Sequence, residues 1–429
     1  MRGAFLFLTL SLAAFACKKH PPPPSPDSPA PPPAPAPDQP ARCRPASAEP
    51  PFVLGPADTG RAPASAAEDG GRLERDESLP FATEVGDGIM WSGGFAVGAL
   101  HESETSLAMS VVTLGRDGRN AKIIPLRIAH GDVEPPRLAA RASTLIVGVL
   151  EPEPNGRALR LAKIEDGKVS WGATLQQKSG ESQAFDIALG DKKGIVVWDE
   201  DGPTSGVIQV STFDVTTASS ATPPRPISPP AVDAESPRVV ARAGGGYWLA
   251  YIARSAAGED RDAQYVPEDI GFRWIEVASL DGNGSPTAAP RAATPKDGHV
   301  MVFDIAPAAE SEALLVWRAD DSPTGSAGGE VMRAVVRAAR IDAPSILVPA
   351  DVGAGVPSVL EGWLAVMDAA ERTRLAPLSP AGELTAPLSA EPEIGSGEPL
   401  AGGSEALLVA RPAGRAVKLM VLKCTPNGQ

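Results

Sequence analysis

The sequence predicts an all-β fold built from seven repeated units, and three observations lead to this prediction. Seven short apolar runs recur between residues 95 and 410, at spacings of 44 to 66 residues. Asp-Gly pairs separate strand-like segments of alternating polarity. The 429 residues include 43 Gly and 46 Pro, a content that disfavours long helices. Four strands in each of seven consecutive units is the layout of a seven-bladed β-propeller.

The seven runs are too short for typical helices and are rich in β-forming residues, so each is expected to form a buried strand. They are Phe95-Ala96-Val97-Gly98, Leu145-Ile146-Val147-Gly148, Ile195-Val196-Val197-Trp198, Trp248-Leu249-Ala250-Tyr251, Leu314-Leu315-Val316-Trp317, Trp363-Leu364-Ala365-Val366 and Leu407-Leu408-Val409-Ala410.

Each run is flanked by further strand-like segments. A short strand is expected before it, as at residues 137–140, and an alternating strand after it, as at residues 275–280. A turn such as Asp166-Gly167 follows, because both residues tolerate positive φ. A fourth strand, as at residues 122–126, ends the unit.

The two ends of the repeat region predict how the ring closes. The seventh unit stops at Cys424, after its third strand, while a strand-like segment at residues 79–85 precedes the first unit. We expect this N-terminal strand to complete the last blade, which removes exposed sheet edges. A linear β-solenoid is the main alternative, with shorter coils and no borrowed strand.

The N-terminus has the pattern of an export signal. Residues 1–16 carry one early cation, Arg2, and an apolar run too short to span a bilayer. The run ends in Ala14-Phe15-Ala16-Cys17, which resembles a bacterial lipobox and implies a lipid on Cys17. Secretion with cleavage nearby is the alternative. A cation at Lys18, where an acidic residue often marks inner-membrane retention, favours the outer membrane.

The Pro- and Ala-rich composition of residues 17–78 predicts a disordered linker, which is followed by a propeller at residues 79–429. Runs such as residues 21–24 and 31–37 favour extended polyproline II and cannot bury a core. The linker would hold the propeller away from the membrane.

With Cys17 assigned to lipid, Cys43 and Cys424 remain, and an exported chain meets a compartment in which they can pair. Whether they are bridged is left open by the sequence. Two distant Cys and four scattered His show no metal-ligand spacing, so neither a metal nor a cofactor is expected.

Two units are most alike. Phe185-Asp186-Ile187-Ala188 corresponds to Phe303-Asp304-Ile305-Ala306, and Trp198 corresponds to Trp317. With these repeats the chain resembles β-propeller lipoproteins of Gram-negative bacteria. The resemblance covers roughly residues 79–429, is one of architecture only, and implies no particular activity.

In a propeller the innermost strand of each blade lines the central channel. The start of this inner strand is expected 7 to 12 residues before the third residue of each apolar run. The residues at that position, which we expect at the mouth of the channel, are Asp87, Arg137, Asp186, Arg238, Asp304, Ser358 and Glu398. Their nearly alternating charges suit a small charged ligand or a partner's side chain. The alternative is that they pair with one another, because unpaired buried charge is costly.

The loops after the apolar runs should lie on the same face, and the longest, residues 255–271, is acidic. It contains Asp260, Asp262 and Tyr265, which are candidate contacts for a basic partner. Solvated loops that aid solubility are the alternative. Trp198, Trp248, Trp317 and Trp363 are expected to pack between blades rather than form a sugar platform.

A net charge of −14 argues against nucleic-acid partners. The first hypothesis is a non-catalytic, lipid-anchored propeller that binds or scaffolds an envelope protein or glycan. The alternative is an envelope hydrolase or lyase acting on glycan. It requires two channel-mouth carboxylates that lie close together without Arg partners.

Overall fold

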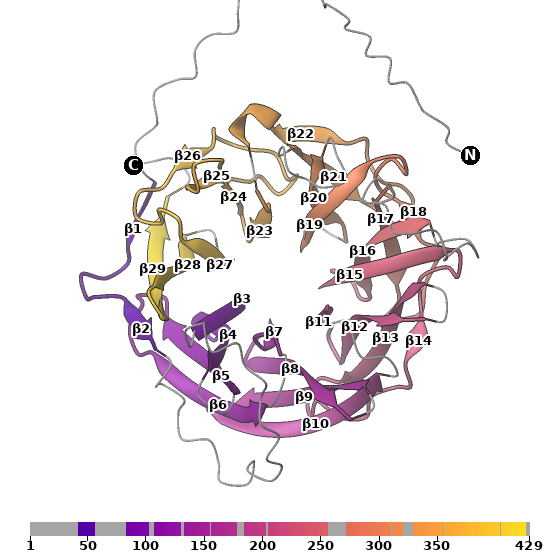
Figure 1. Ribbon diagram of the computed structural model, residues 1–429, viewed down its shortest axis with the longest axis horizontal. Coiled ribbons are helices and arrows are strands. Elements are labelled where there is room, and N and C mark those ends of the chain that lie inside the picture. The colour runs from indigo at the N-terminus through magenta and orange to yellow at the C-terminus, as the bar shows by residue number, and fades with distance from the viewer. Residues whose placement is uncertain are drawn as a thin grey trace, which may run out of the picture. The chain divides into compact units, whose positions relative to one another are not determined.

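The computed structural model describes residues 42–55, 83–102, 107–129, 133–154, 156–177, 184–202, 205–255, 272–309, 311–320, 329–353, 355–403 and 405–425. They form seven antiparallel sheets arranged as blades around a central axis, which confirms the predicted seven-bladed propeller (Figure 1). Each blade runs from an inner strand to an outer one.

The blades are numbered in chain order, with strands given from the inside outward. Blade 1 contains β3 (Thr83–Trp91), β4 (Gly94–Glu102), β5 (Leu107–Gly115) and β6 (Lys122–Ala129); blade 2 contains β7 (Arg137–Arg141), β8 (Thr144–Glu153), β9 (Gly156–Glu165) and β10 (Lys168–Gln177). Blade 3 contains β11 (Phe185–Leu189), β12 (Lys193–Asp201), β13 (Gly206–Asp214) and β14 (Arg225–Pro226); blade 4 contains β15 (Val232–Ala241), β16 (Tyr247–Ser255), β17 (Trp274–Leu280) and β18 (Arg291–Ala292).

Blade 5 contains β19 (His299–Pro307), β20 (Ala313–Asp320), β21 (Glu330–Val336) and β22 (Ser345–Val348), and a short 3₁₀ helix, η3 (Ala350–Val352), follows it. Blade 6 contains β23 (Ser358–Leu360), β24 (Trp363–Met367), β25 (Thr373–Pro377) and β26 (Ser389–Ala390). Blade 7 contains β27 (Glu398–Gly402), β28 (Ala406–Ala413), β29 (Ala416–Cys424) and the N-terminal strands β1 (Cys43–Pro45) and β2 (Phe52–Leu54).

The apolar runs form the second strand of each blade, and burial of that strand on both faces explains why the runs are uninterrupted. Successive side chains of a strand point to opposite faces, and in a propeller both faces are covered by neighbouring blades. Ile195 and Val197 of β12 pack into the core shared with blade 4, while Val196 packs into the core shared with blade 2. A strand buried on both sides needs apolar residues at every position.

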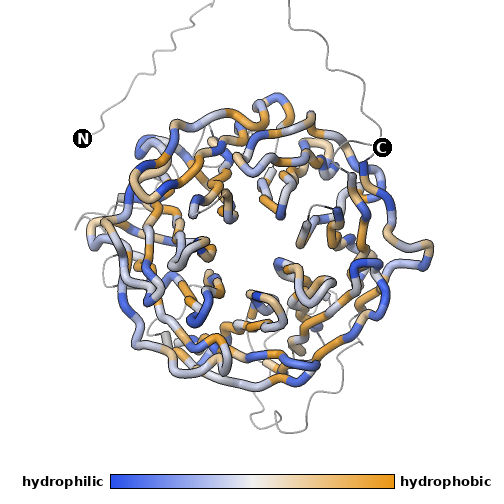
Figure 2. Tube along the Cα trace, turned by 180° about the vertical axis from the view of Figure 1, so that it is seen from behind, coloured by the Kyte–Doolittle hydropathy of each residue, from blue (hydrophilic) through white to orange (hydrophobic). Residues whose placement is uncertain are grey.

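Seven hydrophobic clusters result, one between each pair of neighbouring blades. In Figure 2 hydrophobic segments accordingly recur in every blade around the ring. Trp198, Trp248 and Trp363 are among the largest fully buried side chains, and Trp317 is buried with them in these clusters. The Trp residues therefore pack between blades, as the sequence predicted.

The closing strand differs from the predicted one. The N-terminus does complete the last blade, but β1 and β2 pair with β29, whereas the segment that begins the repeat region is the inner strand β3 of blade 1. β1 is Cys-Arg-Pro within a Pro-rich stretch, so no strand propensity marks it. Its pairing is imposed by contacts with blades 6 and 7.

Two contacts hold β1 in place. Cys43 lies opposite Cys424 in the strand pair, and the two are joined by a disulfide with an S–S distance of 2.09 Å. The buried Glu391 carboxylate accepts hydrogen bonds from the backbone N–H of Arg42 and of Cys43, both at 3.1 Å to Oε2. Ser389 donates a further bond, at 2.8 Å, to Oε1 of Glu391.

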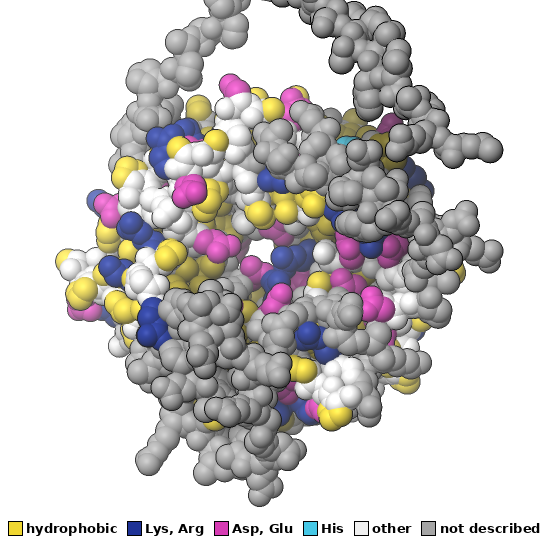
Figure 3. Space-filling model, viewed as in Figure 1, with side chains coloured by type: hydrophobic (Ala, Val, Ile, Leu, Met, Phe, Trp, Pro, Cys, Tyr) yellow, Lys and Arg dark blue, Asp and Glu magenta, His cyan; other side chains and the backbone are white. Residues whose placement is uncertain are grey.

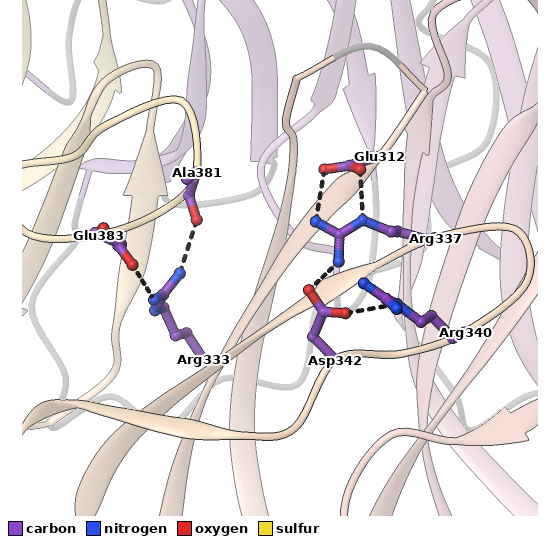
Figure 4. Close-up of polar contacts among 7 residues, drawn as sticks. All are labelled: Glu312, Arg333, Arg337, Arg340, Asp342, Ala381 and Glu383. Atoms are coloured by element: carbon purple, nitrogen blue, oxygen red, sulfur yellow. Dashed lines mark hydrogen bonds and ion pairs between the residues drawn. The ribbon is translucent and has the colours of Figure 1, made fainter.

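Polar links at the rim add to the apolar seams between blades. Arg333 of β21 donates to the carbonyl oxygen of Ala381 at 2.7 Å and to Glu383 at 3.0 Å, both of which lie between β25 and β26 of blade 6 (Figure 4). Within blade 5, Arg337 bonds Glu312 and Asp342 together, as the same view shows.

The linker predicted at residues 17–78 contains β1 and β2, so residues 42–55 belong to the propeller instead. The signal peptide, Cys17 and the rest of that linker lie outside the described residues. Within the part of the chain that the structure describes, no helix has the length and hydropathy to cross a membrane.

Candidate functional site

The cross-strand register places the predicted channel residues at equivalent positions of the inner strands. Asp186, Arg238, Asp304 and Ser358 each lie opposite the third residue of the adjoining apolar run: Val197, Ala250, Val316 and Ala365. Arg137 and Glu398 lie opposite Gly148 and Ala410, one residue further along. In blade 1, Gly88 takes this position, opposite Val97, and Asp87 lies in the adjacent bulge.

Asp87 joins three blades through its carboxylate. Its Oδ2 accepts a hydrogen bond from Arg137 of blade 2 and another, at 3.1 Å, from Arg238 of blade 4. The Asp87 side chain is 58% exposed, so this ion-pair network lies at an open mouth. Figure 3 shows acidic and basic side chains side by side around the centre of this face.

Asp186 and Asp304 form two equivalent clamps between neighbouring inner strands. Oδ1 of each accepts the next residue's N–H, from Ile187 at 2.9 Å and from Ile305 at 2.8 Å. Oδ2 of Asp186 accepts the N–H of Val239 at 2.8 Å. Oδ2 of Asp304 accepts the N–H of Val359 at 2.7 Å. Both carboxylates therefore hold backbone across a blade seam, which accounts for the Phe-Asp-Ile-Ala repeat.

The charges of this group influence one another's protonation. Burial and the nearby charge of Arg238 lower the pKa of Arg137 to about 10, against the attraction of Asp186 and Asp304. Burial raises the pKa of Asp304, and the charge of Arg238 opposes that shift. The arrangement compensates charge internally, which is what a structural role of these residues requires.

Ser358 and Glu398 line a separate pocket of about 410 Å³, which we call the blade-six pocket. Its other walls come from the end of blade 5, the connection into β23, strands β24 and β25, and the start of β27. The lining residues are Arg318, Gly353, Gly355, Val356, Ser358, Ala365, Val366, Met367, Asp368, Thr373, Glu398 and Pro399.

Glu398 is the unpaired carboxylate of this pocket. The residue is exposed, and its side chain makes no hydrogen bond or ion pair with another described residue. Partial desolvation by the surrounding chain raises its pKa. Asp368, by contrast, accepts bonds from Arg372 at 2.9 Å and from Arg374 at 2.8 Å. Burial would raise the pKa of Asp368, but these arginines hold it at about 2.

Several pocket residues were missed from the sequence. Arg318, Met367 and Asp368 follow the apolar runs of blades 5 and 6 within three residues, at the ends of those strands. That position was a usable signal, because consecutive blades bring these strand ends to one face. Val356 carries no such signal, since it lies in an irregular connection.

A second acidic group lies at the ends of the strands of blades 3 and 4. Asp199 is buried, and its Oδ2 accepts the N–H of Ser236 at 2.9 Å, while Oδ1 has no partner among the described residues. Burial raises the pKa of Asp199 to about 7, and the charges of Glu235 and Asp201 add to that shift. The predicted partner contacts Asp260, Asp262 and Tyr265 lie outside the described residues.

Within the described ranges no three His, Cys, Asp or Glu side chains lie close enough together to hold a metal ion. Asp281, in the turn after β17, accepts the backbone N–H of Asn283 and of Ser285, each at 2.8 Å. This is the hydrogen bonding of a turn.

No protein-family model matches the chain, and no curated protein matches it in sequence. Solved structures share its fold. A polysaccharide lyase, Uly1, has a TM-score of 0.51 at 7% identity, with 87% of this chain and 97% of the lyase covered. A prolyl endopeptidase has a TM-score of 0.49 at 13% identity, with 82% of this chain covered, and the match spans 48% of the endopeptidase.

The β-propeller domain of the Trilobed protease from Pyrococcus furiosus gives a TM-score of 0.46 at 10% identity, with 80% of this chain and 92% of that domain covered. At 7% identity the likeness to Uly1 concerns the fold alone.

The protonation of Asp199 predicts a pH dependence of stability. Its pKa is about 7 in the folded chain against an ordinary 3.8, so the folded state binds the extra proton between these values. Its contribution to stability is therefore present at low pH and is lost as pH rises toward 7. Asp199→Asn keeps an acceptor for Ser236 and removes this loss. We expect the advantage of the variant over wild type to grow by about 1 to 4 kcal/mol between pH 5 and pH 8.

Urea unfolding of both proteins at the two pH values measures this change. Asp201→Asn, which removes a neighbouring charge but leaves the buried carboxylate in place, is the matched control. An advantage of Asp199→Asn that is the same at both pH values would contradict the assignment.

Proposed function

We propose that the chain is a non-catalytic binding module of the cell envelope, anchored by a lipid on Cys17 and held away from the membrane by its Pro-rich segment. The observation that carries the non-catalytic part is the bonding of the channel-mouth carboxylates. Asp87 is shared by two arginines, and Asp186 and Asp304 have both oxygens engaged by backbone N–H groups. Carboxylates committed in this way are poor acids, bases or nucleophiles.

The surface charge supports a basic partner. Asp199, Asp201, Asp233 and Glu235 lie at the strand ends of blades 3 and 4. Arg254 and Arg273 pair with Asp233 and Glu235. The connection that carries Asp260, Asp262 and Tyr265 begins after Ser255, the last residue of β16, and its sequence is acidic. An acidic face of this kind steers and orients a positively charged protein surface.

The alternative, a hydrolase or lyase acting on glycan, is less well supported. A mechanism in which channel-mouth carboxylates serve as acid and base needs two carboxyl groups that act as a pair. Of the four channel-mouth candidates, Glu398 alone has no hydrogen-bonding partner among the described residues, so a second free carboxylate is missing from that set. Cleavage of an envelope glycan by the purified protein, abolished by Glu398→Gln, would favour this alternative.

Capture of partners from envelope extract tests the binding proposal. A triple variant, Asp260→Asn, Asp262→Asn and Tyr265→Ala, should lose a specific basic partner that the wild type retains, because it removes charge and an amphipathic contact from the acidic face. Glu165→Gln with Asp166→Asn is the control, since it removes two exposed charges from the β9–β10 turn. Identical capture by all three proteins would refute the acidic face as the binding surface.

Lipid anchoring is tested separately. Cys17→Ser should move the protein from the membrane fraction to the soluble fraction of the native host, because no thiol remains to carry the lipid. Labelling with an alkyne fatty acid should be lost at the same time. Continued membrane retention without a label would show that another segment attaches the protein.

A further inference from the structure

We propose that the blade-six pocket binds a lysine side chain of a partner protein, with Glu398 as the counter-ion of the ammonium group. This inference extends the proposed binding function. It rests on that function for one premise, which is that the occupant of the pocket is a protein. The walls of the pocket, its charges and its acceptors each point to a cation at the end of an apolar stem.

The walls of the pocket suit the methylene chain of a lysine side chain. Val356, Ala365, Val366, Met367 and Pro399 supply apolar surface, and Val356 is 58% exposed although it is a large hydrophobic side chain. Lysine buries its four methylenes along such surface and keeps its charge at the tip. A volume of about 410 Å³ is within the range of small-ligand sites and has room for the side chain and its flanking backbone.

The charges select a cation. Arg318 is held by Asp320 at 2.6 Å, and Asp368 is held by Arg372 and Arg374. The carboxylates of Asp320 and Asp368 are therefore already paired with arginines. Glu398 is exposed at the pocket and is the lining carboxylate that has no partner among the described residues. It therefore offers an unpaired negative charge with which an incoming cation can form a charge-assisted hydrogen bond.

The acceptors favour ammonium over guanidinium. Glu398 and the Ser358 hydroxyl line the same pocket from neighbouring inner strands, and the Ser358 side chain also has no hydrogen bond to a described residue. One carboxylate and one hydroxyl suit a compact donor with three N–H groups. A guanidinium is recognised best by a bidentate carboxylate together with a stacking surface, and no aromatic residue lines the pocket.

The test uses the full chain with ¹³C-methyl methionine, so that the Met367 methyl resonance reports on the pocket. The probes are the peptide acetyl-Gly-Lys-Gly-amide, the same peptide with Nε-acetyl-lysine, and n-pentylammonium. The lysine peptide should shift the Met367 resonance in a saturable manner, and lysine acetylation should weaken binding at least tenfold. Glu398→Gln should weaken binding of the lysine peptide by a similar factor.

Glu361→Gln is the matched control, because Glu361 belongs to blade 6, which supplies much of the pocket's wall, but lies in the β23–β24 turn, outside the pocket. Equal binding of the acetylated and free lysine peptides, or unchanged binding by Glu398→Gln, would overturn the proposal. Binding of n-pentylammonium without the peptide would assign the pocket to a small amine instead. Failure here together with successful partner capture would refute this inference and leave the proposed binding function standing.

Discussion

The fold depends on one constraint, which is that every blade must be covered on both faces by another blade. Neighbouring residues of a strand such as β12 enter different hydrophobic clusters, so a blade with a missing neighbour would expose half of its apolar surface. Seven blades meet this condition only as a closed ring. The seam between blades 7 and 1 has its own cluster, to which Leu54 of the N-terminal β2 contributes. Chain ends and blade packing therefore stabilise the same closure.

The repeat, the strand count and the positions of the inner strands could be predicted because they follow from local patterns. Uninterrupted apolar runs predict strands buried on both faces, and counting back from them located Asp186, Arg238 and Asp304 correctly in the inner strands. The closing strand could not be predicted, since Cys-Arg-Pro has no strand propensity and its pairing depends on the distant Glu391. The blade-six pocket is similarly assembled from segments of three blades that no local pattern connects.

The charged side chains of the ring fall into two groups, those that are paired within the protein and those that lack a partner. At the channel mouth, carboxylates meet arginines and backbone N–H groups, and they tie blades together. At the strand ends of blades 3 and 4 Oδ1 of Asp199 has no partner among the described residues, and in the blade-six pocket the Glu398 carboxylate has none. These oxygens are the part of the acidic set that is not used to hold blades together.

Native-state hydrogen exchange at the N-terminal strand tests ring closure most directly. The Ala46 N–H donates to the Val421 carbonyl at 2.9 Å, and the Cys43 N–H donates to Glu391 at 3.1 Å. In a closed ring these amides exchange slowly, with protection similar to that of the central strand β28 of the same blade. Exchange of both at the rate of an unstructured peptide, while β28 stays protected, would show an open seam and contradict the account.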